Sequence, residues 1–191
     1  MKLKAFYFNN FREITYLLSD DAGQTVIIDC GSYTDREKQQ VADYISQNSL
    51  TPRLHLLTHA HLDHLCGARF LLEKYNLVPY LSDRDLYYFN NQLLQSQLFG
   101  MPLSDEPIDR FMPIADYEVF RIGDIEIKSL PTPGHSPDGM SFYCESEGIV
   151  FSGDTLFYMS IGRFDMPRSN YGELMNSIRQ ELFSLPDDTK V

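Results

Sequence analysis

Cysteine is scarce in this sequence, and long apolar runs are missing altogether. Among the 191 residues there are three cysteines, Cys30, Cys66 and Cys144, which lie far apart and form no Cys-x-x-Cys pair. This pattern argues against a cysteine-ligated zinc site or a disulfide framework and is typical of a reducing, cytoplasmic location. No stretch approaches the ~18 apolar residues of a transmembrane helix, and the first residues carry no apolar run of signal-peptide length.

Positive charge is also in short supply. Lys and Arg number 16 against 27 Asp and Glu, which gives a formal net charge of −11. A chain this acidic repels phosphate backbones and anionic membrane surfaces. We therefore expect no nucleic-acid partner and no membrane partner. A small-molecule substrate is the expected partner, and the oligomeric state stays open.

The remaining composition is that of a folded protein. Hydrophobic residues make up 43% of the chain, which includes 13 Phe and 12 Tyr. A chain of this length can bury the core of one domain. No internal repeat, low-complexity segment or long linker interrupts it, so we interpret residues 1–191 as a single domain.

Hydrophobic alternation predicts strands in both halves of the chain. The expected strands are Leu3–Phe8, Ile14–Leu18, Thr25–Asp29, Arg53–Leu57, Val78–Leu81, Tyr117–Arg121, Ile125–Leu130, Met140–Cys144 and Ile149–Ser152. The expected helices are Thr34–Asn48 with a Thr34/Glu37 capping box, Leu65–Tyr75, Asp83–Leu98, and one capped by Asn170 with Glu173. Strands mixed with helices in this way predict sheets that pack face to face under outer helices.

The densest group of potential metal ligands lies in Thr58-His59-Ala60-His61-Leu62-Asp63-His64. Because His59 and His61 are two residues apart, their rings lie on the same side of an extended segment. Asp63 and His64 follow the bend. Imidazole nitrogen and carboxylate oxygen are ligands that Zn²⁺ and Fe²⁺ accept. One ion cannot easily use all four groups, whereas two ions ~3.5–4 Å apart can.

Two later segments each add one potential ligand. His135 lies in the turn Thr132-Pro133-Gly134-His135-Ser136, and Asp154 lies in Ser152-Gly153-Asp154-Thr155 after the next strand pair. An aspartate at a strand end, preceded by glycine, is well placed to bridge two ions. Either segment is weak by itself, but together with the first motif they predict a metal site.

The order T-H-x-H-x-D-H, P-G-H-S and G-D-T resembles the metallo-β-lactamase superfamily, and most of all its glyoxalase II-like (hydroxyacylglutathione hydrolase) branch of small single-domain proteins. The resemblance implies an α+β fold, a four-layer αβ/βα sandwich of two mixed sheets. It also implies that the first metal is held by His59, His61 and His135, and the second by Asp63 and His64. Asp154 would bridge the two. The expected cofactor is Zn²⁺, or Fe²⁺ or Mn²⁺, as one or two ions.

The resemblance further implies hydrolysis of a thioester by water whose pKa is lowered from ~15.7 towards ~7 beside the metals. A thiol has a pKa of ~8.5, so a thiolate leaves without help from a strong acid. We assign catalytic roles to Asp63 and Asp154. In this branch a basic residue nine positions after the bridging aspartate contacts the glutathione carboxylate, and Arg163 has that offset. The tyrosine expected two positions later is replaced by Asp165, which weakens the prediction for glutathione.

One expected ligand is missing from this sequence. The superfamily uses another His near the C-terminus, but this chain has no His after His135. Residues Leu185–Val191 resemble the lead into the strand before that turn. We therefore expect the natural chain to continue past Val191, so that domain 1–191 lacks its C-terminal strand and last metal-binding turn. The first metal site is expected to be better occupied than the second.

Three alternatives remain open from the sequence. An oxidoreductase with the same fold, a persulfide dioxygenase, would hold one Fe(II) with His59, His135 and Asp154. A nuclease of the superfamily is disfavoured by the acidic charge. A metal-binding protein without turnover is possible for a chain that lacks one ligand.

We interpret His55 as a strand residue, and Cys30 and Cys66 as buried packing residues. If the helix Asp83–Leu98 borders the site, its aromatic residues could shape an apolar substrate slot.

Overall fold

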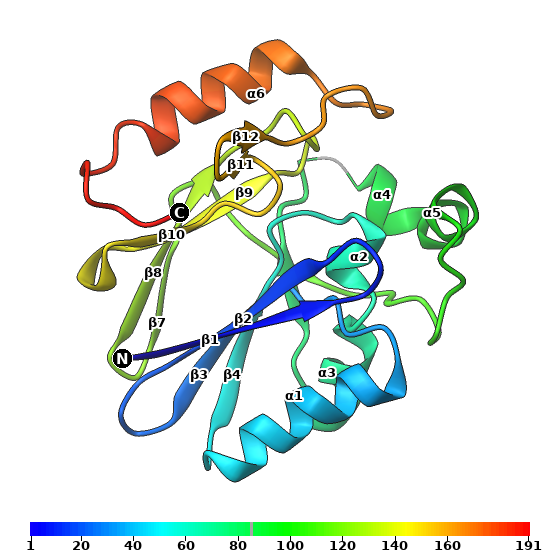
Figure 1. Cartoon of the computed structure of the whole chain (residues 1–191), viewed down its shortest axis with the longest axis vertical. Coiled ribbons are helices and arrows are strands. Elements are labelled where there is room, and N and C mark those ends of the chain that lie inside the picture. Colours follow the sequence, from blue (N-terminus) through cyan, green and yellow to red (C-terminus); the bar gives the residue numbers. More distant parts are fainter. Residues whose placement is uncertain (85) are drawn as a thin grey trace.

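The structure, a computed structural model, describes residues 1–84 and 86–191, and two sheets form the centre of the described part (Figure 1). The first sheet has the strand order β1-β2-β3-β4-β5-β6. Its strands are β1 (Lys2–Phe8), β2 (Glu13–Ser19), β3 (Gln24–Ile28), β4 (Thr51–Leu56), β5 (Pro79–Leu81) and β6 (Met112–Pro113). Strands β1 to β3 pair antiparallel, and β3 to β6 pair parallel. The carboxyl ends of β3 and β4 therefore lie at the same edge.

The second sheet has the strand order β10-β9-β8-β7. It consists of β7 (Val119–Ile122), β8 (Ile125–Pro131), β9 (Met140–Cys144) and β10 (Ile149–Phe151), which all pair antiparallel. Lys190 adds a parallel bridge to Ile149 at the edge of this sheet. A short hairpin of β11 (Leu156–Phe157) and β12 (Ser160–Ile161) follows β10.

Helices cover the outer faces of both sheets. In Figure 1, α1 and α3 lie on one side of the two sheets and α6 lies on the other. The helices are α1 (Asp35–Gln47), α2 (Leu62–Leu65), α3 (Ala68–Tyr75), α4 (Tyr87–Asn90), α5 (Gln92–Phe99) and α6 (Tyr171–Ser177), which continues as the π-helical segment Ile178–Leu182; a 3₁₀ turn spans Glu145–Glu147. The predicted capping box of Thr34 and Glu37 is confirmed at the start of α1. None of the described helices is long and apolar enough to span a membrane.

Alternating side chains explain the layers. On β3, Val26 and Ile28 point into the core between the sheets, whereas Ile27 packs among residues of the α1 and α3 layer. On β9, Phe142 faces the same inter-sheet core, and Tyr143 packs against the α6 layer. Since successive side chains of a strand point to opposite faces, each sheet packs against the other sheet on one face and against helices on the other. The predicted four-layer αβ/βα sandwich is confirmed.

Two predicted helices are interrupted. The helix expected over Asp83–Leu98 is wrong as one element, because Asn91, with φ −120° and ψ 37°, separates α4 from α5; residue 85 lies outside the described residues. The helix expected over Leu65–Tyr75 is divided into α2 and α3 near Gly67. A Cβ at Gly67 would lie 2.5 Å from the Cys30 sulfur, so close packing against the loop after β3 requires glycine here.

Candidate metal centre

The predicted ligands meet at one edge of the two sheets. His59 and His61 follow β4, while His135 follows β8 and Asp154 follows β10. The rings of His61 and His135 are in contact, with centroids 4.6 Å apart, and Nδ1 of His61 lies 2.9 Å from Nε2 of His135. Imidazoles from two separate turns, one from each sheet, therefore lie side by side.

The donor atoms form two adjacent groups. One ligand atom from each of His59, His61 and His135 lies within 4.8 Å of the others, and the same holds for His59, His64 and Asp154. Asp63 lies beside the second group, with its carboxylate 3.7 Å from Nε2 of His64. The geometry brings together all six residues singled out in the sequence.

An unpaired nitrogen and two facing nitrogens show that the first group fits a metal ion. Nε2 of His59 is buried and has no hydrogen-bond partner among the described residues, and Nδ1 of His61 faces Nε2 of His135 at 2.9 Å. A buried polar atom without a partner is costly. A cation bound to the lone pairs of these imidazoles would remove that cost, and neutral imidazole is a common ligand of zinc and iron. The residues of this group could therefore hold a metal ion.

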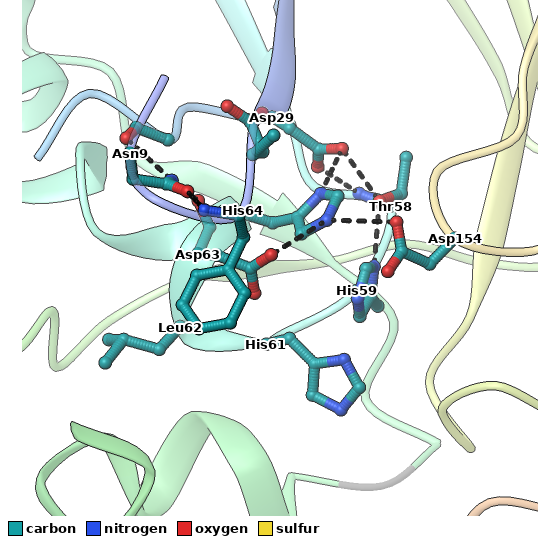
Figure 2. A network of polar contacts seen from close by, with 12 residues as sticks. Asn9, Asp29, Thr58, His59, His61, Leu62, Asp63, His64 and Asp154 are labelled. Atoms are coloured by element: carbon teal, nitrogen blue, oxygen red, sulfur yellow. Dashed lines mark hydrogen bonds and ion pairs between the residues drawn. The ribbon is translucent and has the colours of Figure 1, made fainter. Parts of the chain in front are cut away.

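Asp29 orients two of the rings and was missed by the sequence analysis. Its carboxylate accepts hydrogen bonds from Nδ1 of His64 at 2.9 Å and from the hydroxyl of Thr58 at 2.8 Å (Figure 2). Because the Thr58 hydroxyl donates to Asp29, its oxygen accepts from Nδ1 of His59 at 3.0 Å. Protons held at Nδ1 leave Nε2 of both rings available to a metal.

A backbone carbonyl orients the ring of His135 and holds its proton at Nδ1. Nδ1 of His135 donates to the carbonyl oxygen of Arg163 at 2.8 Å. Nε2 of this ring therefore faces the centre, 3.4 Å from the carboxylate of Asp154. The same carboxylate lies 3.3 Å from Nε2 of His64, so Asp154 lies between the two groups.

Charge is concentrated around the second group. Burial lowers the pKa of His64, but its contacts with Asp29, Asp63 and Asp154 outweigh this and raise the pKa well above its usual value. Burial raises the pKa of Asp154, yet the charge and hydrogen bond of His64 bring it down to about 2. A metal ion that binds here would replace the His64 proton as the positive charge among these carboxylates.

By contrast, burial holds the pKa of His59 and His61 well below the usual value, so these rings are neutral.

Two glycines permit the turns that carry His135 and Asp154. Gly134 has φ +137°, and a Cβ there would lie 2.2 Å from the backbone nitrogen of Leu174 in α6. Gly153 has φ +52°, and a Cβ there would lie 2.5 Å from the hydroxyl oxygen of Thr58. Glycine adopts such conformations without strain and has no Cβ to collide with these atoms, which explains the P-G-H and G-D patterns of the sequence.

Three polar side chains that the sequence analysis missed hold the loop of the first motif. Gln95 of α5 donates to the carbonyl of Ala60 at 3.0 Å and accepts from the backbone nitrogen of Leu62 at 3.0 Å. Asp138 accepts from the backbone nitrogen of Ala60, and Asn9 donates to the carbonyl of Asp63. These residues lie far from the motif in sequence, and no local pattern marks them.

One hollow reaches this centre, and a second lies beside it. One, of about 510 Å³, is lined in part by Asp63, His64 and Asp154. The other, of about 220 Å³, lies between α4, α5 and the segment after β12, and Arg163 and Asp165 are among its lining residues. The Arg163 guanidinium forms two hydrogen bonds with the Asp165 carboxylate, and both side chains are exposed.

The other residues discussed from sequence contribute no donor atom to the two groups of candidate ligands. His55 is on β4, as predicted, and is fully buried. Cys30 is buried, and burial raises the pKa of its thiol to about 12. Cys66 is part-buried, and its thiol contacts the carbonyl oxygen of Asp63 at 3.7 Å. None of the three belongs to the group of donor atoms around His59.

The family model described as the metallo-beta-lactamase superfamily matches residues 13–190. The chain belongs to this superfamily. Members of the metallo-beta-lactamase superfamily bind metal ions and include many hydrolases, which agrees with the donor set described above.

Individual relatives within the superfamily cover most of the chain. A probable metallo-hydrolase of Bacillus subtilis, YqgX, is 35% identical over 92% of this chain and 81% of its own length. The hydroxyacylglutathione hydrolase GloC of Haemophilus influenzae is 33% identical over 93% of this chain and 82% of its own length. Among solved structures, TTHA1623 in a di-iron-bound form has a TM-score of 0.83 at 31% identity and covers 96% of this chain and 87% of that one.

Proposed function

We propose that this superfamily member is a metal-dependent thioester hydrolase of the glyoxalase II-like type. One observation carries the proposal: Asp154 lies between two groups of donor atoms that share His59. This arrangement suits a pair of cations, held by His59, His61 and His135 on one side and by Asp63 and His64 on the other. The similarity to a hydroxyacylglutathione hydrolase supports the thioester, and a solved relative that binds two irons supports a pair of ions.

The bound cations, Zn²⁺ or alternatively Fe²⁺ or Mn²⁺, would supply water of lowered pKa and a Lewis-acid contact for the substrate carbonyl. Asp154 keeps the two halves of the centre at a fixed separation. Asp63 accepts a hydrogen bond from the attacking water and directs its lone pair towards the carbonyl. The hollow of about 510 Å³ beside both carboxylates admits that water.

The leaving group decides which substrate suits this site. A thiol has a pKa of ~8.5, so the sulfur departs as thiolate at neutral pH without a proton from the protein. An amide or a simple ester needs a general acid at the leaving atom. The side chains around the centre are imidazoles oriented by Asp29 and by the Arg163 carbonyl, and carboxylates. A thioester is therefore the substrate class that the donor set supports best.

Arg163 is proposed to contact the polar end of the substrate. It lies at the rim of the 220 Å³ hollow, and its backbone carbonyl contacts the His135 ring. Its planar fork is suited to a carboxylate, although Asp165 occupies two of its donors in this structure.

The proposal is tested with the metal-loaded chain. Thiol release from S-lactoylglutathione is measured after loading with Zn²⁺, Fe²⁺ or Mn²⁺, together with metal content by elemental analysis. We expect turnover, and we expect Asp154→Asn to lower both metal content and turnover. Asp21→Asn is the matched control, because Asp21 is exposed in the β2–β3 turn, at the opposite end of β3. Oxygen uptake with glutathione persulfide and no thioester hydrolysis would instead establish the dioxygenase alternative.

A further inference from the structure

An apolar slot lies next to the candidate metal centre, because two of its aromatic residues contact His61. It has a volume of about 220 Å³ and is formed by α4, α5 and the segment after β12. Its apolar lining consists of Tyr87, Tyr88, Leu94, Leu98, Phe99 and Met166. A hollow of this size can take a short alkyl or small aromatic group, although it cannot enclose a whole tripeptide.

Two aromatic side chains are shared between the slot and the centre. The ring of Tyr88 lies edge-on to that of His61, with centroids 4.4 Å apart, and Phe99 is 6.4 Å away in the same orientation. Figure 2 shows His61 on the side of the centre away from Asp29. A substrate group that extends from the centre past His61 would therefore approach the slot at Tyr88 and Phe99.

The polar groups that line the slot already have partners. The amide of Gln95 donates to the carbonyls of Ala60 and Tyr88 and accepts from the nitrogen of Leu62. Arg163 and Asp165 pair with each other at 2.9 and 3.2 Å, so their opposite charges compensate. A charged or strongly polar group placed inside would lose its hydration without gaining new partners, which is unfavourable.

Two apolar side chains of the slot, in contrast, are exposed to solvent. Leu98 is 67% exposed and Leu94 is 38% exposed, although both are large apolar side chains. Exposed apolar surface beside a polar centre is typical of a ligand-binding position. Burial of this surface by an apolar group is favourable in proportion to the area removed from water.

We infer that the slot binds an apolar substituent of the thioester while its carbonyl lies at the metal centre and its polar end stays outside the slot, at the rim beside Arg163. This inference rests on the proposed function and adds the substrate class: thioesters with an alkyl or aromatic group next to the reacting carbonyl or sulfur, in preference to small hydroxyacyl groups. The apolar group belongs either to the acyl part or to the thiol part, and the experiment separates these two sources.

The first experiment measures kcat/KM of the metal-loaded chain for two substrate series. One series has acyl groups of two to eight carbons on glutathione, and the other has acetyl esters of straight-chain thiols of increasing length. We expect kcat/KM to rise by about fourfold for each added methylene in one series until the slot is full. The series that rises identifies the part of the substrate in the slot. Values independent of length in both series would overturn the inference.

A matched pair of variants on α5 adds a second test. Leu98→Trp places a larger side chain in the lining and is expected to reduce kcat/KM for the longest substrates at least tenfold, while the two-carbon substrate changes little. Leu93→Trp is the control, because Leu93 is 60% exposed on the same helix and does not line the slot. Equal effects of both variants, or none, would count against the slot.

A binding measurement distinguishes failure of the inference from failure of the proposed function. The S-hexyl thioether of glutathione has no thioester carbonyl, so its sulfur–carbon bond cannot be hydrolysed. We expect calorimetry to show that it binds at least tenfold more tightly than the S-methyl thioether, and that Leu98→Trp removes the difference. If no thioester is hydrolysed but this preference holds, the proposed reaction fails and the apolar slot stands. Equal binding of both thioethers overturns the slot.

Discussion

The carboxylate of Asp29 holds Nδ1 of His64 at 2.9 Å and, through the Thr58 hydroxyl, also fixes His59. Asp29 follows β3, whereas the two histidines follow β4, and these strands are parallel neighbours. One acid that is not among the proposed ligands thus determines the ring orientation in both groups of donor atoms. Loss of a partner of this kind commonly lowers metal affinity about tenfold to hundredfold.

Asp29→Asn is predicted to weaken metal binding without unfolding the chain. Asp29 has φ +56°, and asparagine tolerates this conformation, so the substitution changes the acceptor and spares the backbone. One oxygen of Asp29 accepts from His64 and the Thr58 hydroxyl, and the other accepts from the Thr58 backbone N–H. An amide has only one acceptor oxygen, so its NH₂ group would face one of these sets of donors and disturb the orientation of the rings. Competition with a chelator is expected to show a tenfold to hundredfold lower affinity. Unchanged affinity, equal to that of Asp21→Asn, would show that Asp29 does not orient the ligands.

Gln95→Leu is predicted to destabilise the loop of the first motif. The substitution removes the acceptor of the Leu62 backbone N–H and the donor to the carbonyls of Ala60 and Tyr88. Unpaired buried groups cost about 1–3 kcal/mol each, so we expect the free energy of unfolding to fall by about 3 kcal/mol. Denaturant titration measures this loss. Gln97→Leu is the control on the same helix, because Gln97 is exposed; equal losses for the two variants would contradict the role of Gln95.

Gly153→Ala is predicted to disturb the centre more than a backbone penalty alone explains. Gly153 and Gly148 have similar conformations, with φ +52° and +59°. A Cβ at Gly148 meets no atom within 4 Å, whereas one at Gly153 would meet the Thr58 side chain. In both variants the left-handed conformation of the alanine costs about 1–2 kcal/mol of folding free energy. Only Gly153→Ala is expected to lower metal content, as measured by elemental analysis. Equal metal content in both variants would exclude displacement of the Thr58 side chain by the new Cβ.

His55 is predicted to make the fold sensitive to acid. Burial lowers its pKa to about 3, and neither ring nitrogen has a hydrogen-bond partner among the described residues. The unfolded chain binds a proton at His55 below pH ~6.5, whereas the folded chain does not until about pH 3. Stability is therefore complete above pH ~6.5 and falls as the pH decreases through this window, by about 1.4 kcal/mol for each unit.

The test compares the chain with His55→Leu, both in the presence of chelator so that the proposed ligands contribute equally. Between pH 6.5 and 5, we expect the unsubstituted chain to lose about 2 kcal/mol more free energy of unfolding than the variant. Parallel pH profiles of the two proteins would mean that His55 is hydrated or paired in solution. Circular dichroism during denaturant titration provides the measurement.

Local patterns in the sequence were sufficient for most of the strands and helices and for the choice of candidate ligands. The capping box of Thr34 and Glu37, the alternation of β3 and the hairpin of β7 and β8 each depend on residues a few positions apart. The metal-binding motif is equally local, because His59 and His61 share one extended segment. Two turns with glycines at positive φ then present His135 and Asp154. Each of these features can be read from its neighbours along the chain.

Only the tertiary structure decided how these pieces are held and what surrounds them. Asp29, Gln95 and Asp138 act on the motif from 29 to 78 positions away, through the pairing of parallel strands and the packing of α5. The break at Asn91 turns the expected long helix into two, and α4 and α5 together with the Arg163 segment enclose the slot. The reason is physical: periodicity and caps reflect the backbone's short-range preferences, whereas hydrogen bonds between distant segments exist only once the sheets and helices have packed.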